Sequence, residues 1–345
     1  MAGEDVRRLS PEELAAQYYV AQARHARRAA DRVQALWAEL DRRDLTGSWE
    51  ALVGPQVVRA VAQGQFAAAS GADEYVDAVS EADDVVPDRA GRTRALAFAG
   101  RAADGRPLES LLYLPVITTK RSLAAGADDV EAMMTGLNQL LRIAASEVAD
   151  AGRSAAGVSI AGQRTINGYI RVVNAPACAR CIILAGVEYG WNRGFQRHPK
   201  CDCVHMPARL LARGRLHAGA TNARQYFDGL SRTEQNRVFT AAGAQAIRDG
   251  AKISQVVNAR RGIYTVGDQY GRRIRATREG TTRSGLFASL ERHRAIARGD
   301  LRPADHRKFQ LRSPRLLPEQ IYRVARSRDE AIGLLQHYGY LGWHL

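Results

Sequence analysis

The position of the cysteines is the feature that most constrains how this chain can fold. All four cysteines of the 345-residue sequence lie in one window, in the pattern Cys178-x2-Cys181 followed by His198-x2-Cys201-x-Cys203. A Cys-x2-Cys pair places two thiolates at a tight turn, where both can bind one zinc ion at about 2.3 Å. The window therefore predicts a small central module held together by a structural zinc ion.

The second half of the predicted zinc site has more donors than it needs. In an extended chain, the side chains of a Cys-x-Cys pair share one face at a separation of roughly 7 Å. Unless the chain bends, only one of the two binds easily, and His198 becomes the natural fourth ligand. We predict that four of these residues bind the metal: Cys178, Cys181, His198, Cys201 and Cys203.

Three other interpretations of the window stay open. A redox-active cysteine pair would be expected within a βαβ pattern, which is missing around Cys178 and Cys181. A disulfide knot is a second alternative. A ββα-metal nuclease would use His198 or His205, but only Asp202 and Asn192 are nearby as further oxygen ligands. A site closed by four protein ligands leaves no position for water, so the zinc prediction implies no metal chemistry.

The net charge of +14 is distributed unevenly along the chain. Residues 1–150 are net acidic, whereas the part after Asp150 carries the whole positive excess. Its densest basic run contains Gly and Thr, a composition typical of an exposed loop or hairpin, and comprises Arg272, Arg273, Arg275, Arg278 and Arg283. We predict that these arginines contact phosphates of DNA without reading its sequence; the alternative is a solvated face.

A second DNA-binding arrangement follows from two predicted helices separated by Gly250, at 234–249 and 253–259. They fit a helix-turn-helix whose exposed side chains would be Gln255, Asn258, Arg260 and Arg261. The favoured interpretation is a plain helical hairpin that buries Phe239, Ile247, Ile253 and Val256, because apolar spacing alone does not indicate DNA binding.

Helices dominate the predicted fold, since alanine and arginine are abundant and aromatic residues are few. Ser10-Pro11 with Glu13, and Ser231 with Glu234, each predict a capping box. We expect helices at 11–44, 55–69, 72–82, 126–149 and 318–337, a strand at 169–173, and an edge strand or extended linker at 111–119 because of Pro115. The sequence thus predicts a helix-rich α+β protein with three regions: a helical N-terminal region (1–110), a zinc-stapled α/β module (111–215) and a basic helical C-terminal region (216–345).

No secretory signal pattern and no apolar run of roughly 20 residues is present, so we expect a cytoplasmic protein with no membrane partner. The aromatic end, with Tyr338, Tyr340 and Trp343, either anchors a protein partner or folds back on the last helix.

The window resembles a known protein family. Val172-Val173, Cys178-x2-Cys181 and the run His198-Pro199-x-Cys201-x-Cys203 resemble the Mu protein F-like (MuF) head morphogenesis domain of tailed phages. The second half of the chain, including residues 243–250, 256–262 and 277–282, is similar to minor capsid proteins of actinobacterial phages that carry this domain. The match covers roughly residues 110–345.

This resemblance implies a structural, non-enzymatic minor capsid protein of the virion. Such a protein binds the portal protein, assists procapsid assembly in the bacterial host cytoplasm and is located in the capsid interior near the portal. Scaffold protein, major capsid protein and DNA are further partners that the resemblance allows, including ejection with the DNA. A capsid maturation protease or zinc-containing nuclease is the alternative, although no Gly-x-Ser-x-Gly or His-Glu-x-x-His motif occurs.

Overall fold

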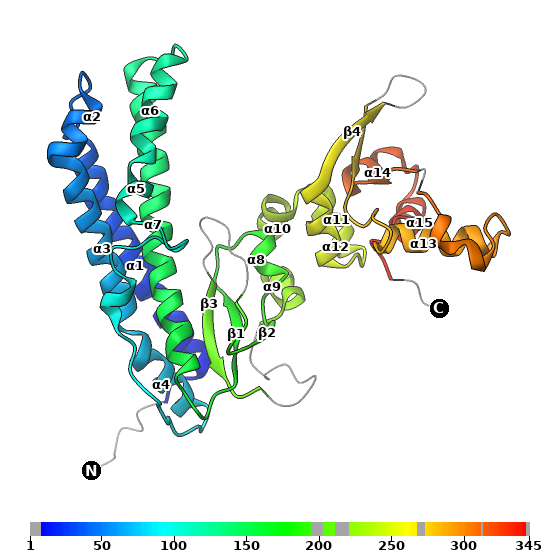
Figure 1. The fold of residues 1–345 in the computed structure, drawn as a ribbon. Coiled ribbons are helices and arrows are strands. Elements are labelled where there is room, and N and C mark those ends of the chain that lie inside the picture. Colours follow the sequence, from blue (N-terminus) through cyan, green and yellow to red (C-terminus); the bar gives the residue numbers. More distant parts are fainter. Residues whose placement is uncertain (1–7, 195–202, 211–220, 268–272, 312, 343–345) are drawn as a thin grey trace. The chain divides into compact units, whose positions relative to one another are not determined.

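The computed structural model describes residues 8–194, 203–210, 221–267, 273–311 and 313–342 (Figure 1). It is a helix-rich α+β protein, 61% helical, with two small three-stranded sheets. Contacts within the chain form two compact units. The first comprises residues 1–176 and 185–221, and the second comprises residues 177–184 and 222–345. Among the described residues, no helix combines the length and the apolar character that crossing a membrane requires.

The first unit is built on long helices that run side by side (Figure 1). Its helical elements are α1 (Pro11–Trp37), α2 (Leu45–Ser48), the π-helical turn η1 (Trp49–Val53), α3 (Gly54–Ser70), α4 (Ala72–Ala82), the 3-10 turn η2 (Ala95–Phe98), α5 (Leu108–Leu112), α6 (Leu114–Ala124) and α7 (Asp129–Ala161). The predicted capping box at Ser10 is confirmed, because its hydroxyl accepts a hydrogen bond from the Glu13 amide at 3.1 Å. Residues on both sides of position 110, such as Val33, Leu112 and Leu140, share one core.

The predicted strand or linker at 111–119 is wrong. This segment forms the end of α5 and the start of α6, and Pro115 occupies the first turn of α6, where a proline costs no hydrogen bond. Val116 is fully buried in the helical core, so its burial overrides the weak β preference of a branched residue. The first helix also ends at Trp37 rather than at Asp44, and α7 continues to Ala161.

An antiparallel sheet with the strand order β2-β1-β3 packs on the helices of this unit. Its strands are β1 (Gly168–Val173), β2 (Glu188–Gly190) and β3 (Cys203–Ala208). The predicted strand at 169–173 is confirmed as β1. Two stacked tyrosines attach β3 to the helices: the Tyr18 and Tyr75 rings lie 3.9 Å apart, and the Tyr75 hydroxyl donates to the backbone oxygen of His205 at 2.9 Å.

A polar clamp holds the irregular segment between α4 and α5 in place. The Arg89 guanidinium lies between the carboxylates of Asp73 and Asp77, at 3.0 and 2.8 Å. Burial alone would raise the pKa of Asp73, but hydrogen bonds from Thr93 and the Arg89 charge keep this pKa below its usual value. The hydroxyl of Ser159 accepts from Arg89 at 2.9 Å, which commits this buried serine to the clamp.

The second unit combines short helices with a second antiparallel sheet. Its helical elements are α8 (Ala179–Ile182), α9 (Ala223–Gly229), α10 (Arg232–Phe239), α11 (Ala241–Arg248), α12 (Ile253–Ala259), the 3-10 turns η3 (Arg260–Gly262) and η4 (Pro303–Lys308), α13 (Leu286–Ala297), α14 (Pro318–Val324) and α15 (Arg328–His337). The sheet has the order β4-β5-β6, with β4 (Ile263–Gly267), β5 (Arg273–Thr277) and β6 (Arg315–Leu316). The capping box at Ser231 is confirmed.

Two predicted helices of this unit are each divided in two. The helix at 234–249 breaks at Thr240, whose φ of 67° is not helical and whose hydroxyl caps α11. The helix at 318–337 breaks at Ala325, which is extended, before Ser327 caps α15. In both cases a hydroxyl residue offers the backbone an alternative to a continuous helix.

Candidate metal centre and basic hairpin

The first cysteine pair lies on one helical turn of the second unit. Cys178 is the N-cap of α8, and its backbone oxygen accepts hydrogen bonds from the amides of Cys181 at 3.0 Å and Ile182 at 3.1 Å. Cys178 is exposed, whereas Cys181 is buried. Ile182 anchors this turn in the apolar core of the unit beside residues such as Phe227. The two cysteines are three residues apart at one turn, which is the spacing of a cysteine pair that binds one zinc ion.

Cys203 begins strand β3 in the first unit. Its Cα pairs with that of Val173 at the end of β1, and its side chain is buried. His205 follows two residues later, and its buried ring packs on Tyr169 with centroids 4.3 Å apart. His205 is therefore packed within the same sheet that carries Cys203. It is one of the two histidines that a ββα-metal nuclease would use.

The other two predicted ligands, His198 and Cys201, lie outside the described residues. Within the part of the chain that the structure describes, no group of three or more His, Cys, Asp or Glu side chains could hold a metal ion. The donor chemistry and turn geometry of Cys178 and Cys181 fit half of a tetrahedral zinc site. The complete site stays a prediction.

Strands β4 and β5 place the predicted DNA-contacting arginines on a hairpin. Arg273 and Arg275 are exposed and alternate with the half-buried Ile274, so the two arginines share one face of the sheet. Among the described residues, neither forms an ion pair, and both stay available to an anionic partner. The Arg278 guanidinium lies over the ring of Tyr264, 5.5 Å from its centroid. The sequence left a loop and a hairpin open for this segment, and the pairing of β4 with β5 shows a hairpin. Arg272 lies outside the described residues.

Two of the four side chains predicted to contact DNA in a helix-turn-helix form interactions within the second unit. Gln255 accepts a hydrogen bond from Arg315 at 3.0 Å, and Arg260 pairs with Glu319 at 2.5 Å. Only Arg261 among the named cations of this segment is exposed without an ion pair to a described residue. Helices α11 and α12 bury Ile247, Ile253 and Val256 in the core, as a helical hairpin requires.

The described part of the aromatic end folds back on the second unit. Tyr340 is fully buried, and its hydroxyl donates to the backbone oxygen of Leu316 at 2.9 Å. The Arg315 guanidinium lies 4.4 Å from the centroid of the Tyr340 ring. Of the two interpretations of this end, the structure favours intramolecular packing for Tyr338 and Tyr340; Trp343 lies outside the described residues.

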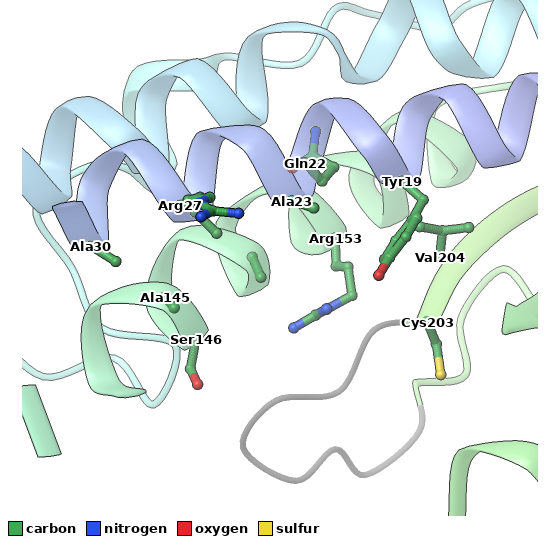
Figure 2. A pocket seen from close by; sticks show the side chains of 12 residues that line it. Tyr19, Gln22, Ala23, Arg27, Ala30, Ala145, Ser146, Arg153, Cys203 and Val204 are labelled. Carbon is green, nitrogen blue, oxygen red and sulfur yellow. The ribbon is translucent and has the colours of Figure 1, made fainter. Parts of the chain in front are cut away.

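A groove between α1 and α7 of the first unit was not singled out from the sequence (Figure 2). Its volume is about 360 Å³. Part of its wall is made of alanines, namely Ala23, Ala26, Ala30, Ala145 and Ala149, and the rest includes Tyr19, two arginines and Cys203 of strand β3. The spacing of these alanines by three or four residues on each helix is the signal that could have revealed it.

No protein-family model matches the chain, and no curated protein or solved structure shows significant similarity to it.

Proposed function

We propose that this protein is a MuF-like minor capsid protein that binds the portal and assists head assembly. The observation that carries the proposal is the pattern Cys178-x2-Cys181 with His198-Pro199-x-Cys201-x-Cys203. The local structure around it supports this proposal: strand β1 precedes a tight turn with both cysteines, and Cys203 opens the strand that pairs with β1.

In the proposed role, zinc closes the cysteine module and supplies folding energy rather than catalysis. Cys178 and Cys181 would hold one side of the ion, with His198, Cys201 and Cys203 as candidates for the other. The long helices of the first unit provide a stiff body for docking, because each is held by an extensive apolar core.

The portal interaction is tested by co-sedimentation of the full chain with assembled portal protein at micromolar concentration. We expect the chain to sediment with the portal particles and to remain in the supernatant without them. A chain that stays in the supernatant in both cases contradicts the portal-binding role. Cleavage of scaffold or major capsid protein in the same mixture would instead favour the protease alternative.

DNA contact by the basic hairpin forms a separate prediction. We expect Arg273→Ala with Arg275→Ala to weaken nonspecific duplex binding and to reduce the slope of log K against log salt by about 2, because each arginine releases about one counterion. Fluorescence anisotropy over a salt series measures this slope. Arg260→Ala is the matched control, because Arg260 already pairs with Glu319. An equal slope in the double variant and the wild type would exclude the hairpin from DNA binding.

A further inference from the structure

An apolar stripe runs along helix α7. It repeats every three or four residues and consists of Val130, Met134, Leu137, Leu141, Ala145 and Ala149. Its first two residues are exposed, and the other four are half-buried, with Leu137 and Leu141 also in contact with the core of the first unit. Val130 is 63% exposed and Met134 is 49% exposed, although both are large apolar residues. Apolar anchors at this spacing are typical of a helix that packs against another helix.

The stripe changes in size from one end to the other. Val130, Met134 and Leu137 form a ridge of large side chains in the first half of α7. Ala145 and Ala149 in the second half form, together with Ala23, Ala26 and Ala30 of α1, the walls of the groove in Figure 2. Helix α7 thus carries the ridge in its first half and contributes, together with α1, to the groove in its second half.

The ridge and the groove match when two α7 helices lie antiparallel. In an antiparallel pair of identical helices, the numbers of two facing residues have a constant sum. With a sum of about 279, Val130 faces Ala149 of the other copy, Met134 faces Ala145, and Leu137 faces Leu141. Large residues meet small ones on either side of a two-fold axis near Leu137 and Leu141. Such alternation of large and small side chains is what close packing between helices needs.

The ridge cannot fill the groove of its own molecule. Val130 and Ala145 lie on the same continuous helix, and at 1.5 Å per residue they are separated by about 22 Å. The ridge can therefore fill the groove only of a second copy of the chain.

The charges at the two ends of the stripe are complementary. Asp128, Asp129 and Glu131 are exposed beside the ridge. Arg27 lines the groove, is exposed, and forms no ion pair with any described residue. Antiparallel packing brings the acidic end of one copy to the arginine of the other, and a parallel arrangement would not.

We propose that the protein forms a two-fold symmetric dimer in which the ridge of each α7 packs into the α1–α7 groove of the other copy. The contact is isologous, so it closes at two copies. It extends from Val130 to Ala149, a length of about 29 Å. This dimer does not depend on the proposed portal role, whereas Cys203, a candidate zinc ligand, also lines the groove.

Sedimentation equilibrium of the full chain tests the dimer. We expect a mass twice that of the 37.8 kDa chain at micromolar concentration. Met134→Glu places a carboxylate in the apolar contact twice per dimer and should raise the dissociation constant at least about tenfold. Leu52→Glu is the control, because Leu52 is 53% exposed and lies outside the stripe.

A size exchange separates this contact from other ways of dimerising. Ala145→Met alone fills the groove and should weaken the dimer, as should Met134→Ala alone, which removes the ridge. The double variant restores one large and one small residue at each pair, so its dissociation constant should return towards that of the wild type. Circular dichroism of each variant reports whether the helices are retained.

Three outcomes would overturn the proposal. These are a wild-type chain that sediments as a monomer, a dimer that Met134→Glu leaves unchanged, and a double variant that is no tighter than the single ones. If the groove instead binds a helix of another protein, the purified chain sediments as a monomer.

Discussion

Replacing Arg315 by alanine is expected to lower the free energy of unfolding of the second unit by roughly 3–5 kcal/mol. The Arg315 side chain is fully buried and donates three hydrogen bonds. Its acceptors are the backbone oxygens of Tyr338 at 2.9 Å and Glu279 at 3.0 Å, and the side-chain oxygen of Gln255 at 3.0 Å. Alanine leaves these buried acceptors without their donor and removes the group that packs on Tyr340.

Urea unfolding followed by circular dichroism measures this loss. Arg275→Ala is the matched control: it removes the same side chain from the same sheet, but from an exposed position, and should change stability by no more than about 0.5 kcal/mol. Arg315→Lys keeps the charge without the planar fork and should fall between the two. A loss below about 1 kcal/mol for Arg315→Ala would contradict the role of this arginine as the centre of the unit.

The hydrogen bonds of Arg315 also explain why residue 280 is a glycine. Gly280 has a φ of 75°, a left-handed conformation that L side chains rarely adopt. A Cβ atom there would also lie 2.8 Å from Nη1 of Arg315. The backbone next to Glu279 can therefore approach the guanidinium only because residue 280 has no side chain.

Replacing Cys181 by serine is expected to abolish zinc binding and to unfold the turn that carries the first cysteine pair. The binding free energy of a structural zinc ion at such a site is on the order of 10 kcal/mol and contributes directly to folding. Ile182, which is buried in the core of the second unit, would lose the turn that positions it.

Elemental analysis of the purified chain, combined with thermal unfolding, checks this expectation. We expect one zinc per wild-type chain, retained in the control Arg180→Ser, whose side chain is exposed on the same turn. Acidification should release the metal, because protons compete with zinc for the thiolates. A wild-type chain without metal, or a Cys181→Ser variant that keeps its zinc, would rule out this ligand and reopen the enzyme alternatives.

Local signals in the sequence were sufficient for several helix starts. Ser10 with Glu13 and Ser231 with Glu234 each fix a helix start through contacts within four residues, so no distant partner is needed. The turn containing Cys178 and Cys181 is local in the same way. For this reason the sequence predicts half of the candidate metal site, together with the exposed arginine face of β5.

Only the tertiary structure decided the conformation of residues 111–119. Val116 and the residues around Pro115 suit an edge strand or a helix start, and burial against the core of the first unit selects the helix. Burial likewise distinguishes Arg315, inside the second unit, from Arg275, on its surface, although nothing in the neighbouring sequence separates them. The sequence by itself determined helix caps and the cysteine turn, because their interactions span a few residues. The groove on α7 and the buried arginine depend on residues that are distant in the chain, and folding alone brings those residues together.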